Sequence, residues 1–288
     1  MKVRKAIIAA AGYGTRFLPA TKAVAKEMFP IYNKPTLQYI VEEMSEAGIE
    51  ELLIVIGRGK EMIMNHFDKN YELETELEKK GKLQLLQIAQ KPNDLLKIQY
   101  IKAKEMKGFA DAIYQAKEFC SNEPFVVAVG DELMFEGNSF KELIDCYNKY
   151  NKTTICTSEV SLEDTKKYGI VSGKRIDSNV VLLDKIIEKP QSNPPSNLCS
   201  TGRYVFSPEI FDEIEKLYST TEQGQEIILT EAIEALAEKQ KVVACTPHSV
   251  RFDTGDRLGF VKANLYVALK DEKINAELRD FLKNIVEE

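Results

Sequence analysis

Apolar runs of strand length alternate with helical patterns through the first half of the chain. The strand-like runs cover residues 6–10, 52–56, 98–101 and 125–129, and helical patterns cover residues 37–47, 83–90 and 110–119. Pro35 can open the first of these helices and Gly48 can close it. Strands that alternate with helices in this order predict a mostly parallel sheet with helices on both faces.

The second half has a different pattern, in which short strands follow one another without long helices between them. These predicted strands cover residues 154–160, 169–172, 180–187, 200–206, 242–246 and 250–252. A loop rich in Pro, Ser and Asn, residues 191–197, interrupts them. A long amphipathic helical stretch, residues 258–286, closes the chain and is consistent either with an interface or with a lid over the core.

Charge is distributed unevenly along the chain, with an excess of basic residues near its start. The 288 residues carry a formal net charge of −6, which argues against a general affinity for nucleic acid. The first 34 residues nevertheless hold seven basic side chains against a single acid, Glu27, so that a small polyanion would be drawn there. The basic residues are Lys2, Arg4, Lys5, Arg16, Lys22, Lys26 and Lys34.

Cysteines and apolar segments bear on the compartment. The five cysteines are scattered and never form a CxxC pair, so we expect buried, reduced thiols rather than disulfides or a zinc site. The apolar run at residues 6–11 is too short to cross a membrane or to act as a secretion signal. We therefore expect a cytoplasmic protein that interacts with no membrane.

A glycine-containing loop follows the first predicted strand, over residues 9–30. Gly12 and Gly14 let backbone amides approach a phosphate closely, at the sheet edge where ligands collect in open α/β proteins. The loop lacks the third glycine of a dinucleotide fingerprint and the Gly-Lys-Ser/Thr of a P-loop. Arg16, Lys22 and Lys26 instead offer cations to a phosphate chain, and the alternative is a glycine turn with solvated lysines.

Two acids and one short motif complete the candidate chemistry. Asp131 follows the buried run FVVAV, and Asp253 lies in RFDTGD, so that the two could hold Mg²⁺ together with substrate phosphates. Either aspartate could instead only form a turn or cap a helix. In IIEKP, Glu188 can accept hydrogen bonds from sugar hydroxyls and Lys189 can meet a phosphate, or the two can form a simple surface ion pair.

Four longer segments add to these motifs: GYGTRFLPATKAVAKEMFPI, HFDKNYELETELEKKGK, PSNLCSTGRYVFSPEIF and FDTGDRLGFVKAN. Together they resemble bacterial UTP:glucose-1-phosphate uridylyltransferases, members of the sugar nucleotidyltransferase family, over nearly the whole chain. All sugar nucleotidyltransferases share the glycine-loop signature, whereas the segments that begin with HFD and PSN are more typical of the uridylyl branch.

The resemblance implies a fold, an activity and an assembly. It implies one Rossmann-like domain with small β-rich and C-terminal helical elements, divided into a nucleotide-binding half (1–150), a sugar-binding half (151–256) and a helical segment (257–288). The implied reaction joins UTP and glucose 1-phosphate into UDP-glucose and pyrophosphate, with Mg²⁺ as cofactor. The implied assembly is a homodimer or homotetramer.

The resemblance also implies roles for individual residues. Backbone groups of Ala10, Ala11 and Gly12 would face the uracil. Arg16 and Lys26 would bind the triphosphate and the reacting phosphates, and Asp131 and Asp253 would hold Mg²⁺. The remaining binding residues would be Gly14 in the glycine loop, Gly108 and Gly130 in the nucleoside pocket, Glu188, Gly202 and Glu226 at the glucose, and Lys189 at the sugar phosphate.

Several positions depart from the family pattern. Ala103 stands where a glutamine reads the base, and Ala110 and Asp111 replace a glycine and a histidine beside the nucleotide. Glu132 replaces the second acid of an Asp-Asp pair, and Ala25 replaces a proline. The phosphate and metal positions match, so two alternatives stay open: a related enzyme that uses another base or sugar, such as dTTP, and a sugar-nucleotide-binding paralogue without turnover.

Overall fold

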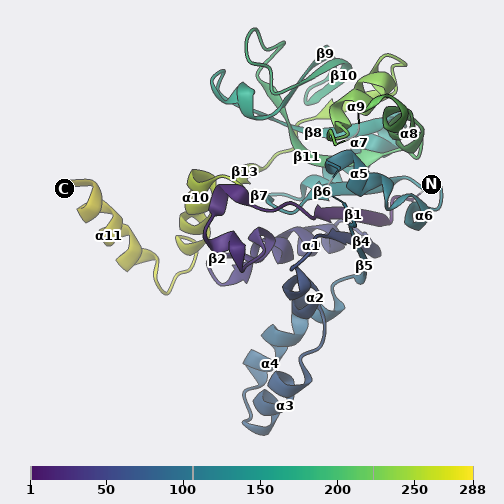
Figure 1. Ribbon diagram of the computed structural model, residues 1–288. Helices are drawn as coiled ribbons and strands as arrows, with labels where there is room; N and C mark the ends of the chain where they lie inside the picture. The colour runs from purple at the N-terminus through teal and green to yellow at the C-terminus, as the bar shows by residue number, and fades with distance from the viewer. Residues whose placement is uncertain (1, 106, 223, 288) are drawn as a thin grey trace.

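A single nine-stranded sheet forms the centre of the protein (Figure 1). The computed structural model describes residues 2–105, 107–222 and 224–287. The strand order is β5-β4-β1-β6-β11-β8-β12-β10-β9, and two small two-stranded sheets lie outside it. The chain is therefore a mixed α/β protein, which confirms the predicted fold class.

The four strands predicted in the first half form one parallel block. They are β1 (Lys5–Ala10), β4 (Glu51–Ile56), β5 (Lys97–Lys102) and β6 (Phe125–Val129). All three pairings within this block are parallel. Since parallel strands end at the same edge, the chain leaves β1 and β6 side by side at one edge of the sheet.

The second half adds the predicted strands in a mostly antiparallel arrangement. They are β8 (Thr153–Glu159), β9 (Gly169–Asp177), β10 (Val180–Glu188), β11 (Leu198–Phe206) and β12 (Val242–Cys245). Strand β11 pairs antiparallel with both β6 and β8, and so joins the two halves into one sheet. Parallel pairing in this half occurs between β12 and β8.

Helices cover both faces of the sheet, as the alternating pattern predicts. On one face, α1 (Thr36–Glu46) and α7 (Ser139–Tyr150) share a core cluster with Ile8 of β1. On the other face, α5 (Phe109–Tyr114), α8 (Ile210–Thr220) and α9 (Leu229–Ala237) share a second cluster with Ile7. Successive residues of a strand point to opposite faces, so β1 contributes to both clusters.

Two helical predictions need correction, and several helices were missed. The stretch 110–119 is two helices, α5 and α6 (Lys117–Cys120), and the stretch 258–286 is also two, α10 (Arg257–Ala268) and α11 (Asn275–Glu287). The second break lies at Asp271, whose carboxylate accepts the backbone N–H of Lys273 and so competes with helical bonding. Helices α7, α8 and α9 were not predicted at all.

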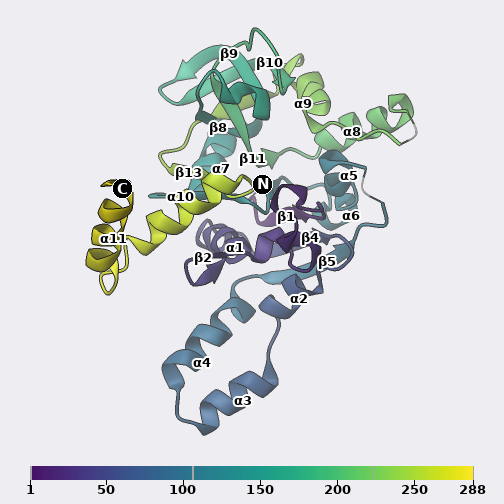
Figure 2. The same cartoon turned by 60° about the vertical axis from the view of Figure 1, so that its left-hand side comes forward.

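A helical arm extends from the body in both views (Figures 1 and 2). It contains α3 (Tyr71–Lys79) and α4 (Leu83–Gln90), reached through α2 (Glu61–Phe67), and neither α3 nor α4 has a buried residue. Helix α11 extends outward at a different edge of the molecule. The small sheets pair β13 (Val250–Asp253) with β7 (Glu132–Phe135) and β2 (Pro30–Ile31) with β3 (Lys34–Pro35).

Two expectations about chemistry and membranes can be compared with the structure. All five cysteines are free and buried, as predicted. Within the part of the chain that the structure describes, no helix combines the length and apolar character that a membrane span requires.

Candidate active site

The candidate site lies at the edge where β1 and β6 end. The glycine loop leaves β1 after Ala10, and Gly130 and Asp131 follow β6 directly. Lys26 opens a single 3-10 turn, Lys26–Met28, at the far end of the loop. Parallel pairing of β1 with β6 therefore brings the cationic loop and the aspartate to one edge of the sheet.

Lys26 and Asp131 are in direct contact. The Lys26 Nζ lies 2.5 Å from the Asp131 Oδ2. Burial on its own lowers the pKa of the Lys26 ammonium, but the carboxylates of Asp131 and Glu27 outweigh it and raise that pKa above its ordinary value. Lys26 is therefore a fixed positive charge at neutral pH.

Asp253 reaches the same place through the small sheet of β13 and β7. Its register pairs Asp253 with Glu132, the residue next to Asp131. The Arg16 guanidinium lies between the two aspartates, with Nη2 4.0 Å from an Asp131 oxygen and Nη1 4.0 Å from an Asp253 oxygen. Both carboxylates thus face the cationic loop and one shared guanidinium.

Two neighbours fix the orientation of the Asp253 carboxylate. The Tyr168 hydroxyl donates to Oδ2 at 3.0 Å, and the Gly255 backbone N–H donates to Oδ1 at 2.9 Å. Burial, followed by the charge of Asp253, raises the pKa of Tyr168, so that its phenol stays a donor. Thr254 connects the two aspartates, because its N–H and its hydroxyl both donate to the backbone oxygen of Asp131.

Gly255 lies where no side chain fits. A Cβ at this position would lie 2.4 Å from the Asp131 Oδ2 and 2.9 Å from the Arg16 Nη2. The glycine in FDTGD therefore permits the close approach of Asp131, Arg16 and Asp253.

A cavity of about 800 Å³ opens beside this charge cluster. Seven of the predicted site residues line it: Arg16, Asp131, Glu188, Lys189, Gly202, Glu226 and Asp253. The others, Ala10, Ala11, Gly12, Gly14, Lys26, Gly108 and Gly130, are not part of its wall, although Lys26 bonds to Asp131 and Gly108 packs against Glu226. The cavity therefore joins the predicted metal and sugar positions, and the predicted base-binding segments lie outside it.

Glu188 and Lys189 lie where the sequence predicts, at the tip of β10. Their side chains form an ion pair, with Lys189 Nζ 3.1 Å from Glu188 Oε1, and both line the cavity. An ion pair at a cavity wall can also bind a ligand.

The residue types of the cluster suit Mg²⁺. This ion prefers oxygen ligands and is usually held by one or two protein carboxylates together with substrate phosphates. Asp131 and Asp253 supply two carboxylates, and each of them lies 4.0 Å from the Arg16 guanidinium. With two carboxylates from the protein, substrate phosphates would complete the coordination of such an ion.

The departures from the family pattern take structural positions. Ala103 extends the β5 ladder through its N–H bond to the Ile56 oxygen, and Ala110 is fully buried. The Asp111 carboxylate accepts hydrogen bonds from Tyr218 at 2.5 Å and from Gln115 at 2.7 Å, and lies outside the cavity wall. Glu132 lines the cavity but forms a two-point ion pair with Arg251.

Some residues of the site were not predicted. Tyr168 and Phe109 both line the cavity, and Tyr168 bonds to Asp253. Little in the sequence points to Tyr168, because its one distinguishing feature is that it directly precedes the predicted strand at residues 169–172. Thr254 and Gly255 carried a stronger signal, since they fall within the FDTGD motif that contains Asp253.

The fold and the cluster define a class of protein: an α/β protein with a cationic glycine loop and two acids beside a cavity of about 800 Å³, as a nucleotide-handling enzyme requires. Residues 5–269 match the family model described as nucleotidyl transferase. A UTP--glucose-1-phosphate uridylyltransferase from Staphylococcus epidermidis is 46% identical over 286 residues, with 99% of each chain covered.

Solved structures give the same result. A UTP-bound UGPase from Acinetobacter baumannii superimposes with a TM-score of 0.88 and 32% identity, covering 97% of this chain and 98% of the other. A UDP-glucose pyrophosphorylase complexed with UDP-glucose superimposes with a TM-score of 0.80 and 35% identity, covering 91% and 97%. The chain belongs to the nucleotidyl transferase family and, within it, to the UTP--glucose-1-phosphate uridylyltransferases.

Proposed function

We propose that this chain joins UTP and glucose 1-phosphate to form UDP-glucose and pyrophosphate. The observation that carries the proposal is the cluster of Lys26, Arg16, Asp131 and Asp253 beside the cavity that Glu188 and Lys189 line. The relative from Staphylococcus epidermidis, which is 46% identical, is named for this reaction. The two similar structures are named as complexes with UTP and with UDP-glucose.

The chemistry needs positioning and charge neutralisation rather than a protein nucleophile. An oxygen of the sugar phosphate attacks the α-phosphorus of UTP, the bond to the β-phosphate oxygen breaks, and pyrophosphate leaves in line. Lys26 and Arg16 hold the triphosphate and counter the charge that builds during the transfer. Lys26 remains protonated for this task because of its carboxylate neighbours.

Asp131 and Asp253 are proposed to hold Mg²⁺. When bound, the ion would neutralise charge on the phosphates and reduce their mutual repulsion. The chain's own contribution is to keep the two carboxylates oriented, through Lys26 at Asp131 and through Tyr168 and Gly255 at Asp253.

The sugar phosphate is proposed to enter the part of the cavity lined by the second half of the chain. Glu188, Gly202 and Glu226 would contact the glucose, and Lys189 would contact its phosphate. Backbone groups of the segment 10–12, with Gly14, Gly108 and Gly130, would bind the nucleoside and its phosphates. The halves 1–150 and 151–256 then correspond to nucleotide and sugar binding.

The partners and the compartment are also proposals. Five buried free thiols support a reducing compartment, the cytoplasm. Exposed apolar side chains on the projecting helices, including Phe281, Ile285 and Val286 of α11, support assembly into a homodimer or homotetramer.

A substrate panel tests the reaction. Pyrophosphate release is measured with UTP, dTTP, CTP and ATP, each combined with glucose 1-phosphate or N-acetylglucosamine 1-phosphate, with Mg²⁺ or with EDTA. We expect the fastest release with UTP and glucose 1-phosphate, and none in EDTA. Faster release with another base would favour the alternative that Ala103 keeps open, and no release with any pair would favour a binding protein without turnover.

A further inference from the structure

A buried ion pair lies next to Lys26, the proposed catalytic lysine, and has no role in the mechanism above. The Lys60 Nζ donates to both carboxylate oxygens of Glu27, at 2.8 and 2.9 Å. Glu27 is 0% exposed and Lys60 is 6% exposed. A buried pair is costly to desolvate and is often no more stabilising than apolar residues, so the fold alone gives little reason for it.

The pair connects the catalytic turn to a different part of the chain. Glu27 directly follows Lys26 within the turn Lys26–Met28, whereas Lys60 lies between β4 and α2. The residue on the other side of Lys26 is held by the same segment, because the Ala25 N–H donates to the Met62 sulfur at 3.2 Å. Contacts from residues 60 and 62 therefore bracket Lys26 on both sides.

Glu27 also packs against the segment that carries Asp131. A Cβ at Gly130 would lie 2.7 Å from the Glu27 Cγ, so the absence of a side chain at Gly130 lets the buried glutamate lie under Asp131. One residue, Glu27, thus contacts the Lys60 turn and the end of β6 while its neighbour Lys26 bonds to Asp131.

We propose that Lys60 and Glu27 are positioning residues, which hold Lys26 at the distance from Asp131 that the reaction needs. They touch no substrate in this assignment and act through Lys26. The inference rests on the proposed catalytic role of Lys26. A displacement of about 1 Å at a reacting group can cost on the order of 100-fold in rate, so the loss of this tether should be visible in kcat.

The test uses a variant in which the pair is removed but no lone charge stays buried, Glu27→Gln/Lys60→Met. The matched control is Glu213→Gln/Lys239→Met, which removes a second Lys–Glu pair whose glutamate is buried and whose Nζ–Oε1 distance is 2.5 Å, away from the cavity wall. Both variants are also made in a Lys26→Ala background. The measurements are kcat, KM for UTP and the melting temperature.

We expect kcat of Glu27→Gln/Lys60→Met to fall by about 10- to 100-fold, with KM for UTP changed less than about 3-fold and the protein folded. In the Lys26→Ala background the same change should cost less than about 2-fold, because residues that act through one another are not additive. The control should stay within about 2-fold of its own parent in each background, the unmodified protein in one and Lys26→Ala in the other.

Two results would overturn the inference. One is a kcat within about 2-fold of the unmodified protein; the other is an undiminished loss in the Lys26→Ala background, which would indicate a purely structural role. If the variant does not fold, Glu27→Gln/Lys60→Gln, which likewise leaves no lone buried charge, is measured by the same criteria, and failure of both to fold would assign the pair to the fold alone. Normal turnover of Lys26→Ala itself would instead contradict the proposed function.

Discussion

The Lys26 ammonium and the Asp131 carboxylate approach to 2.5 Å although 105 residues separate them in the chain. The contact joins the loop that follows β1 to the turn that follows β6. A bound polyanion would meet a cation and a candidate metal ligand at one point, because these two groups are already in contact.

Replacing Lys26 tests its role at the phosphates. Lys26→Ala should lower kcat by about 100- to 1,000-fold, the range seen when one group that stabilises developing charge is removed. The control is Lys22→Ala on the same loop, since Lys22 is exposed and forms no ion pair with any residue that the structure describes. Turnover of Lys26→Ala equal to that of the unmodified protein in a pyrophosphate-release assay would exclude Lys26 from catalysis.

The metal assignment predicts a shift in magnesium requirement. Asp131→Asn and Asp253→Asn should each raise the half-saturating Mg²⁺ concentration by about 10-fold or more, because each removes an anionic ligand. Binding of Mn²⁺ to the UTP complex, followed by electron paramagnetic resonance, should weaken in parallel. Asp184→Asn on β10, outside the cavity wall, is the control. Unchanged Mg²⁺ and Mn²⁺ curves for both site variants would refute the assignment.

Gly255 predicts a steric effect. In Gly255→Ala the new methyl group would lie 2.4 Å from the Asp131 Oδ2, so that Asp131, Arg16 or the loop must move. We expect kcat to fall by about 10-fold or more, as in other small displacements at a reacting centre. Steady-state kinetics together with a melting curve check this, and unaltered kinetics would mean that the close approach is unimportant.

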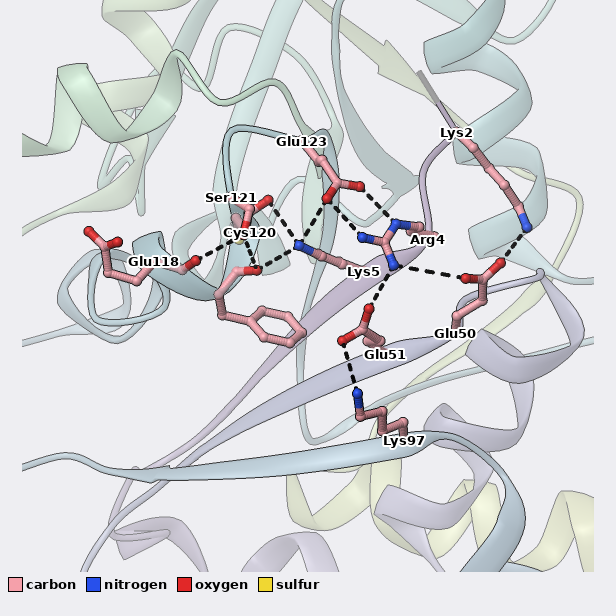
Figure 3. Close-up of polar contacts among 11 residues, drawn as sticks. Lys2, Arg4, Lys5, Glu50, Glu51, Lys97, Glu118, Cys120, Ser121 and Glu123 are labelled. Atoms are coloured by element: carbon pink, nitrogen blue, oxygen red, sulfur yellow. Dashed lines mark hydrogen bonds and ion pairs between the residues drawn. The ribbon is translucent and has the colours of Figure 1, made fainter.

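A charge cluster at the opposite end of β1 predicts a pH dependence of stability (Figure 3). Glu123 accepts hydrogen bonds from Arg4 at 2.8 and 2.9 Å and lies 3.0 Å from the Lys5 Nζ. Hydrogen bonds from Arg4, followed by those from Lys5, lower the pKa of Glu123 to about 2. A lowered carboxyl pKa stabilises the fold above the unfolded value of about 4.3, and this contribution is lost as pH falls toward 2.

Melting temperatures at several pH values measure this contribution. Glu123→Gln should melt below the unmodified protein at pH 7, and the difference should shrink as the pH is lowered from 5 to 3. Glu118→Gln is the control, because the Glu118 side chain is exposed and makes no ion pair within the described part of the chain. A difference that is constant over this pH range would show that ionisation of Glu123 contributes nothing.

The strands of the sheet could be predicted because their apolar runs are buried on both faces, as in Phe125–Val129. Helices α8 and α9 were missed, although each buries one face, because the short strands around them dominated the pattern. The break between α10 and α11 depends on local bonds of Asp271 that periodicity cannot reveal.

The site was predictable where chemistry lies in short motifs, as at Lys26 and Asp131. Tyr168 was not, because its contact with Asp253 spans 85 residues and depends on the pairing of β13 with β7. Asp111 shows the opposite case, in which a charged residue next to predicted site residues bonds to Tyr218 and Gln115 outside the cavity wall.

A crystal structure of the chain with Mg²⁺ and a non-hydrolysable UTP analogue tests the central claim most directly. We expect the ion to contact both Asp131 and Asp253, and the phosphates to contact Lys26 and Arg16. An ion held elsewhere, or a triphosphate bound away from these four side chains, would contradict the proposed site.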